Sequence, residues 1–193
     1  YDAARLLDAA VSSHLLGHME LAANLIKLAN MPSVREWLES VWGKGSPYIQ
    51  YFPVANPLPT YSKIQRAETR MPNKEEQKQI HARDGFYCRF CNLPVIRKEV
   101  RVKLQKMYPD ALPWGRTNNS QHAAFQAMWA QYDHIVPHAR GGTNDLSNLV
   151  LTCAACNFGR MNYTLDEVAI LDPRERHPYQ GTWDGLERIS RVI

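Results

Sequence analysis

Hydrophobic residues recur every three or four positions over residues 2–29. This spacing is that of one face of an α-helix, and it predicts a single amphipathic helix over this range. Pro32 would stop that helix, because proline lacks the backbone N–H that a helix interior requires. The hydrophobic positions are Leu7, Val11, Leu15, Met19, Ala22, Ile26 and Ala29.

A second helix is expected directly after Pro32. Ser33 and Glu36 have the spacing of a capping box, and Gly43 follows as a C-terminal stop. Val34, Trp37, Leu38 and Val41 would share one face. The two helices suggest a hairpin packed on the rest of the chain. The alternative is an element for homodimerisation or for docking a partner protein.

Residues 43–62 combine prolines with aromatic side chains. Pro47, Pro53, Pro57 and Pro59 exclude a regular helix. The aromatic residues argue against a free linker, so we expect an extended segment that lies on the surface of the domain. A stacking platform for bases is the alternative.

The pattern becomes mixed after residue 72. Helices are predicted from Asn73 to about Arg83, from Ser120 through Met128, and from a capping box at Thr164 to about Asp172. Residues 97–108 alternate like a strand but also repeat every four residues, which favours a helix. Strands are predicted at 129–136 and 149–152. The fold class is therefore α+β, with two strands followed by a helix.

Three regions follow from this order of elements. Residues 1–72 form a helical N-terminal region with its proline-rich connector. Residues 73–173 form the main domain, with an insertion at about 97–127. Residues 174–193 form a C-terminal tail.

Composition narrows the choice of partner only slightly. The formal net charge is +4 and the pI is about 8.9, which permits a polyanionic partner without requiring one. The chain has no apolar run of the roughly 20 residues that a membrane helix needs. We also find no signal-peptide pattern, so a cytoplasmic location is expected.

The four cysteines form two C-x₂-C pairs, Cys88–Cys91 and Cys153–Cys156. Two such pairs indicate one tetrahedral Zn²⁺ site with four thiolate ligands. Without a secretory signal, a disulfide framework is the weaker alternative, and a redox pair accounts for only one of the two motifs. A site with four protein ligands has no open position, so this zinc would be structural.

Residues 132–160 also contain Asp133, His134, Asn148 and Asn157. These side chains bind hard cations and transfer protons. Adjacent residues of a strand face opposite sides of the sheet. Asp133 and His134 can therefore share a site only through a bulge or at the end of the strand.

The chain resembles the HNH endonucleases, or ββα-metal nucleases. The matching motifs are C-x₂-C at 88–91, D-H-I-V-P at 133–137, G-G at 141–142, N-L at 148–149 and C-x₂-C-N at 153–157. The last residue of the HNH motif, which is histidine or asparagine in the family, is Asn157 in this chain. The resemblance covers residues 83–171, and it implies a ββα-metal core stapled by the four-cysteine zinc site.

The resemblance also implies roles for individual residues. His134 would be the general base, Asp133 and Asn157 would bind one catalytic Mg²⁺ or Mn²⁺, and Asn148 would fix the loop and orient the base. Arg160 is expected to contact phosphate. His138 is expected either to contact phosphate or only to support the loop.

The resulting hypothesis is a DNA endonuclease that leaves 5′-phosphate and 3′-hydroxyl ends, acting on double-stranded DNA. Bacterial anti-phage defence or restriction would suit such an enzyme. A zinc-stabilised nucleic-acid-binding module without catalysis, and an HNH nuclease that acts on RNA, are the alternatives.

Overall fold

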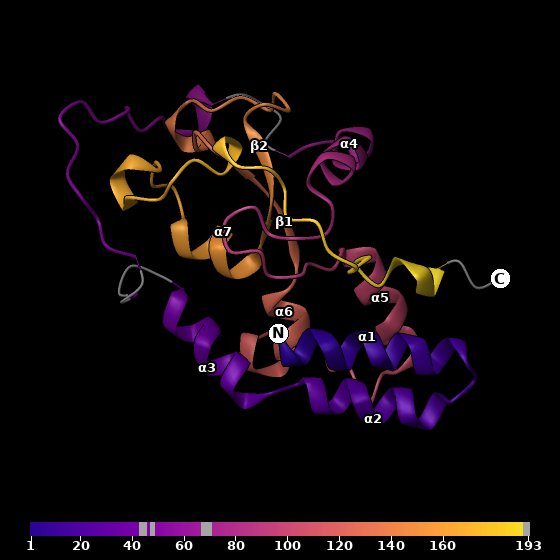
Figure 1. The fold of residues 1–193 in the computed structure, drawn as a ribbon. Helices are drawn as coiled ribbons and strands as arrows, with labels where there is room; N and C mark the ends of the chain where they lie inside the picture. The colour runs from indigo at the N-terminus through magenta and orange to yellow at the C-terminus, as the bar shows by residue number, and fades with distance from the viewer. Residues whose placement is uncertain (43–45, 47–48, 67–70, 191–193) are drawn as a thin grey trace.

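An antiparallel hairpin of two strands, β1 (Ala130–His134) and β2 (Leu149–Cys153), carries the candidate site. The computed structural model describes residues 1–42, 46, 49–66 and 71–190. The register pairs Ala130 with Cys153 and His134 with Leu149. Helix α7 (Ala154–Arg160) follows β2 directly and packs against both strands (Figure 1). The expected α+β class and its ββα order are confirmed.

The N-terminal region contains two helices where one was predicted. Helix α1 (Asp2–Leu15) and helix α2 (Met19–Ala29) lie side by side (Figure 1), and the chain turns between them at Gly17, which has a φ of 85°. The hydrophobic period continues across the turn because each helix has a hydrophobic face, and these two faces pack against each other. Leu15 and Met19, next to the turn, stay 38% and 50% exposed.

Helix α3 (Pro32–Val41) begins at Pro32 itself, with Met31 as N-cap and no side-chain capping bond. The predicted capping box at Ser33 is therefore wrong. Proline is well suited to the first turn of a helix, because the N–H that it lacks would have no partner there. Leu38 is fully buried, and the predicted stop at Gly43 lies outside the described residues.

Two helices of the main domain agree closely with expectation. Helix α4 (Lys74–Asp84) begins with a complete capping box between Asn73 and Glu76. Helix α5 (Lys98–Met107) confirms that residues 97–108 are helical.

Two other helix predictions need correction. Helix α6 (Ala123–Ala127) has His122 as its N-cap, and Ser120 instead ends a short 3₁₀ turn. Thr164 and Glu167 do exchange capping hydrogen bonds of 2.8 and 3.3 Å. Only one 3₁₀ turn follows, however, because the chain leaves helical geometry at Ala169, with a φ of 51°.

Two hydrophobic clusters form the interior. The first joins α1 and α2 to α5, α6 and the C-terminal segment, with Ile26, Leu104, Phe125 and Leu186 among its buried members. The second joins α3, α4 and the hairpin around Leu149 and Leu151.

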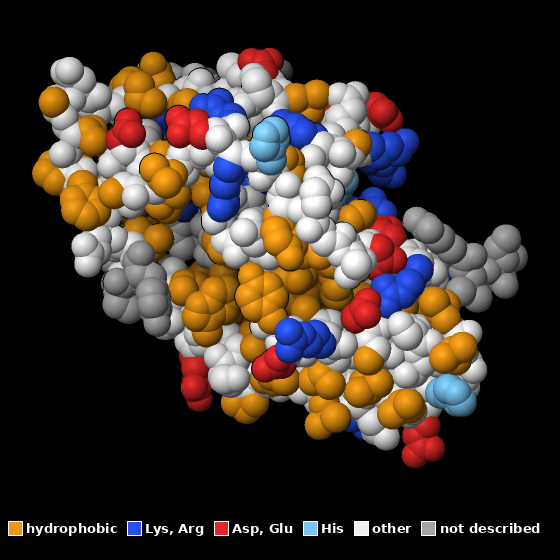
Figure 2. Space-filling model, viewed as in Figure 1, with side chains coloured by type: hydrophobic (Ala, Val, Ile, Leu, Met, Phe, Trp, Pro, Cys, Tyr) orange, Lys and Arg blue, Asp and Glu red, His pale blue; other side chains and the backbone are white. Residues whose placement is uncertain are grey.

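Between the regions that hold the two clusters, hydrophobic side chains reach the surface on one face of the molecule (Figure 2). Trp37, Leu93 and Met128 line a pocket of about 280 Å³ between α1 and α3.

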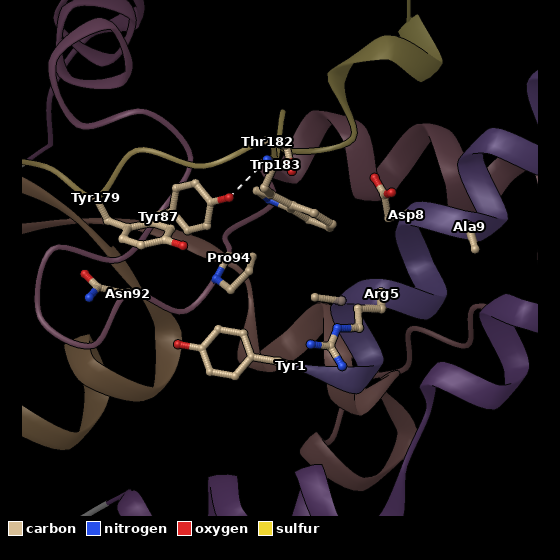
Figure 3. A pocket seen from close by; sticks show the side chains of 11 residues that line it. Tyr1, Arg5, Asp8, Ala9, Tyr87, Asn92, Pro94, Tyr179, Thr182 and Trp183 are labelled. Atoms are coloured by element: carbon tan, nitrogen blue, oxygen red, sulfur yellow. Dashed lines mark hydrogen bonds between the residues drawn. The ribbon is translucent and has the colours of Figure 1, made fainter.

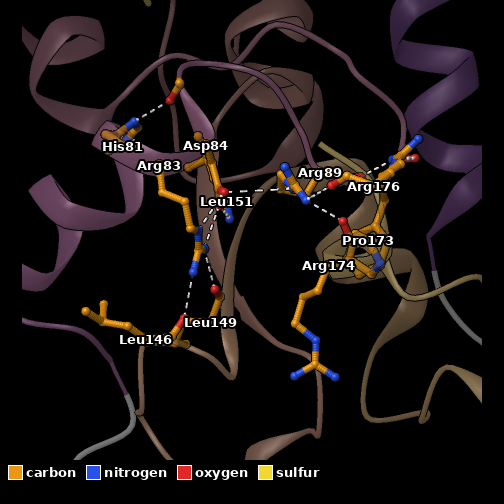
Figure 4. Close-up of polar contacts among 12 residues, drawn as sticks. His81, Arg83, Asp84, Arg89, Leu146, Leu149, Leu151, Pro173, Arg174 and Arg176 are labelled. Carbon is orange, nitrogen blue, oxygen red and sulfur yellow. Dashed lines mark hydrogen bonds and ion pairs between the residues drawn. The ribbon is translucent and has the colours of Figure 1, made fainter. Parts of the chain in front are cut away.

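A buried ionic network ties α4 to β2 (Figure 4). Asp84 is 1% exposed, and each of its carboxylate oxygens accepts a 2.8 Å hydrogen bond from Arg83. The same carboxylate accepts a 2.9 Å bond from the amide of Leu151. Arg89, just after Cys88, donates to the carbonyls of Pro173 and Arg176. These bonds hold the first cysteine pair, β2 and the C-terminal segment together.

Within the described ranges, the helices are all too short or too polar to cross a bilayer.

Candidate active site

Four cysteines meet where the turn at residues 88–93 lies next to the end of β2 and the start of α7. The sulfur atoms of Cys88, Cys91, Cys153 and Cys156 lie within 4.8 Å of one another. Cys91 Sγ and Cys153 Sγ are 3.7 Å apart. A tetrahedral site with Zn–S bonds of about 2.3 Å has S···S edges of about 3.8 Å. The cluster therefore fits a structural zinc ion, as the sequence predicted.

Local structure places each cysteine pair. The amide of Cys88 donates to the Leu93 carbonyl at 2.8 Å, which closes a tight turn that carries Cys88 and Cys91. Cys153 ends β2 and caps α7, whose first turn carries Cys156. Hydrogen bonding with Cys153 and the other two thiols, together with burial, raises the pKa of the Cys156 thiol well above its ordinary value. A divalent cation would favour the thiolates and offset this rise.

A separate polar pocket of about 250 Å³ opens where β1 ends. Asp133 and His134 of β1 and Asn157 of α7 all line it, and so does His138. His134 is the last residue of β1, and this position allows it to share the pocket with its neighbour Asp133. The structure thus brings four of the predicted site residues into one cavity.

The imidazole of His134 is held by a residue that the sequence analysis missed. His134 Nε2 lies 2.7 Å from Asn144 Oδ1. An amide oxygen only accepts hydrogen bonds, so Nε2 carries the proton in this contact. In the neutral ring, Nδ1 is then the basic nitrogen. Asn144 is one of several polar residues in the loop, and its spacing from His134 carries no recognisable signal.

Asn148 closes the loop between the strands. Its Oδ1 accepts from the Val136 amide at 2.9 Å, and its Nδ2 donates to the Thr143 carbonyl at 2.8 Å. Gly142 fits beneath it only without a side chain, since a Cβ atom there would lie 1.8 Å from the Val136 oxygen. These contacts hold the loop, which is what the predicted role of Asn148 requires, and Asn144 makes the contact to His134.

Arg160 occupies a different environment from the one predicted. It is 1% exposed, and its Nη2 and Nε lie 2.7 and 3.1 Å from Asp133 Oδ2. The same guanidinium donates to the carbonyls of His134 and Tyr163 at 2.6 and 2.7 Å. The expectation that Arg160 contacts phosphate is therefore not met, because its donors are engaged inside the protein.

The charge of Asp133 is set by two opposed effects. Burial raises the pKa of its carboxyl above the ordinary value, and the nearby Arg160 guanidinium counteracts that rise. Both hydrogen bonds from Arg160 reach Oδ2. Arg160 thus orients the carboxylate as well as partly neutralising it.

Residues 121–160 match the family model described as HNH endonuclease. The chain contains an HNH endonuclease domain. The matched range includes β1, the Gly-Gly loop, β2 and α7, which together hold most of the pocket lining and half of the cysteine cluster. No curated protein and no solved structure gives a significant match to the chain. HNH nucleases act on nucleic acid, so the family implies a nucleic-acid partner.

The connector before the HNH domain also reaches the pocket. Arg66 is among the lining residues, although it lies well outside the matched range. Tyr61, five residues earlier, donates its amide to the Ala139 carbonyl at 2.9 Å. The sequence predicted that this segment lies on the domain surface, but not that it contributes to the site.

A larger pocket of about 430 Å³ lies between α1 and the C-terminal segment (Figure 3). Tyr87 and Trp183 lie beside each other on one wall, joined by a 3.0 Å hydrogen bond from the Trp183 amide to the Tyr87 hydroxyl (Figure 3). Tyr1, Arg5 and Asp8 form its opposite wall. Among the described residues that line it there is no histidine or cysteine, so the HNH pocket is the better candidate for catalysis.

Proposed function

We propose that the chain is a metal-dependent endonuclease that hydrolyses phosphodiester bonds of double-stranded DNA, leaving 5′-phosphate and 3′-hydroxyl ends. The observation that carries the proposal is the convergence of His134, Asp133 and Asn157 on one polar pocket inside an HNH domain. A protein that only binds nucleic acid needs no oriented base beside a carboxylate.

His134 is assigned as the general base. With Nε2 bonded to Asn144, its Nδ1 accepts a proton from the attacking water. The contact with Asn144 selects this tautomer and fixes the plane of the ring. Asn148 keeps the loop that carries Asn144 in place.

Asp133 and Asn157 would hold the catalytic Mg²⁺ or Mn²⁺. A carboxylate and an amide oxygen suit these hard cations better than they suit zinc, which the four thiols bind. When bound, the cation would stabilise negative charge on the phosphate and on the leaving oxygen. Arg160 holds Oδ2 of Asp133 and so orients the carboxylate that would bind the cation. We assign a phosphate contact to His138, whose ring centre is 5.7 Å from that of His134.

A plasmid-nicking assay tests the proposal. Wild-type protein should nick supercoiled DNA with Mg²⁺ or Mn²⁺, and EDTA should stop the reaction. His134→Ala should lose about 10²- to 10⁴-fold in rate, the usual contribution of a general base. His18→Ala, which removes an exposed histidine before α2, is the matched control and should retain the wild-type rate. The nicking rate of Asn144→Ala should lie between the rates of His134→Ala and His18→Ala.

Other outcomes identify the alternatives. A wild-type protein that binds DNA but never cuts it is a binding module. Cleavage of RNA but not of DNA assigns the other substrate. A role in anti-phage defence predicts fewer plaques on bacteria that express wild-type protein than on bacteria that express His134→Ala, and equal plaque numbers would exclude that role.

A further inference from the structure

The connector segment 54–66, here called the strap, is fixed to the HNH loop. The amide of Tyr61 donates to the Ala139 carbonyl at 2.9 Å, and Arg140 donates to the Leu58 carbonyl. The Tyr61 ring also lies against Gly141, where a Cβ atom would be 3.0 Å from it. The strap is thus bound to the short turn that follows β1.

The strap ends at the mouth of the candidate active site. Arg66 is half-buried and lines the same pocket as Asp133, His134 and Asn157. Its Nε donates to the Tyr61 carbonyl at 2.9 Å. This bond restrains the guanidinium, and in the described part of the chain Nη1 and Nη2 have no hydrogen-bond partner.

The arginines near the site differ in what they can still bind. Arg160 donates its hydrogen bonds to Asp133 and to backbone carbonyls. Arg140 pairs with the buried Glu167 at 2.8 Å. Among the described residues that line the pocket, Arg66 is the one lysine or arginine. It therefore supplies positive charge and free donors to a polar cavity.

We propose that Arg66 binds a backbone phosphate of the nucleic-acid substrate in this pocket, the role that sequence reasoning gave to Arg160. The proposal rests on the proposed function. A guanidinium presents several donors in a planar fork that matches phosphate geometry. Because Nε is already anchored, the two terminal nitrogens are oriented before the substrate arrives, and less side-chain entropy is lost on binding.

The test measures binding without cleavage, in a His134→Ala background. The affinity of a labelled DNA duplex is measured by fluorescence anisotropy over a series of salt concentrations. Arg66→Ala should weaken binding about tenfold and reduce the slope of log K against log salt by about 0.9, the value for one lost phosphate contact. Arg66→Lys should restore part of the affinity. Lys63→Ala removes the same charge from an exposed position on the strap, and should change the affinity less than about twofold.

Hydrogen exchange of the Tyr61 amide separates a phosphate contact from a structural role. Its protection should persist in Arg66→Ala, since the bond to Ala139 remains. Loss of this protection with no rescue by Arg66→Lys would overturn the proposal, because Arg66 would then only hold the strap. Equal effects of Arg66→Ala and Lys63→Ala would also overturn it.

The outcomes distinguish this inference from the proposed function. If the wild-type protein nicks DNA, and the Arg66→Ala protein binds and nicks DNA equally well, only the proposal for Arg66 fails. If the wild-type protein neither cuts nor binds nucleic acid, both fail.

Discussion

Asp133 and Arg160 form a buried ion pair at the centre of the HNH domain. Both side chains are buried, and their closest atoms are 2.7 Å apart. The sequence places an arginine one helical turn after Asn157, but it does not say whether that arginine turns outward to phosphate or inward to a carboxylate. The choice depends on the crossing of α7 over β1, which is a tertiary property.

Arg160→Met should destabilise the fold by about 3–5 kcal/mol, since it leaves a buried carboxylate without its partner. The measurement is urea unfolding near neutral pH. Arg174→Met is the matched control. Its pair with Asp172 is partly exposed, with side-chain exposures of 46% and 21%, and should contribute at most about 1 kcal/mol. Equal losses in the two variants would contradict a special role for Arg160.

The hairpin and its loop are the element that most clearly follows from the sequence. The sequence predicted strands at 129–136 and 149–152 with the Gly-Gly pair between them, and the N-L motif placed Asn148 at the end of that loop. The strand bounds shifted by only a few residues, to Ala130–His134 and Leu149–Cys153.

Gly142→Ala tests how closely this loop is packed. The new methyl group would collide with the Val136 carbonyl, so the loop must shift. We expect a loss of about 1–3 kcal/mol, in the range of overpacked sites, together with slower nicking because Asn144 and Asn148 move with the loop. Ser147→Ala, at an exposed position in the same loop, should leave the stability and the nicking rate unchanged. A Gly142→Ala protein with wild-type stability and rate would show that the loop adapts freely.

Helix ends were harder to predict than helix content. The period over residues 2–29 could not show the turn at Gly17, because two helices that face each other continue one hydrophobic pattern. The box at Thr164 formed its hydrogen bonds without a following helix. Glu167 is also bound, through its other carboxylate oxygen, by Arg140 from another part of the chain.

At the scale of the whole molecule, regions far apart in sequence share one interior. Ile26 of the N-terminal region, Leu104 of the insertion and Leu186 of the tail belong to the first hydrophobic cluster. We propose that the insertion at 97–127 joins the helical region to the nuclease domain. Dimerisation through α1 and α2 stays a prediction, and exposed Leu16, Leu21 and Leu28 are available for it.

The zinc site should contribute folding free energy to the whole domain, because it joins segments about 60 residues apart in sequence. Cys88→Ser should lose the zinc and unfold or aggregate. Metal analysis should find one zinc ion per chain in wild-type protein, and His134→Ala should retain it. A soluble, fully active Cys88→Ser protein would contradict the structural role.

His122 makes stability depend on pH. It is buried beside α2, its Nε2 bonds the Ile26 carbonyl at 2.8 Å, and burial lowers its pKa to about 4. Between pH 4 and 6.5 the unfolded chain binds a proton here that the folded chain does not. Stability is therefore fully present above pH 6.5 and falls as the pH drops towards 4, by about 3 kcal/mol in total.

The comparison with His122→Gln isolates this effect. Urea unfolding of both proteins across pH 4 to 7 cancels the contributions of the other titrating groups. The difference in stability between the two proteins should shrink as the pH falls. A difference that stays constant with pH would exclude His122 as the source.

The sequence by itself determined which chemically active residues this protein has and how they are spaced. The cysteine pairs predict a zinc site, and Asp133, His134 and Asn157 predict an HNH site, because donor chemistry and short-range spacing are local properties. Only the tertiary structure decided that Arg160 turns inward, that Asn144 holds the His134 ring and that Arg66 reaches the pocket. These side chains come from segments whose approach depends on packing between elements, and no local pattern encodes which face of one element meets another.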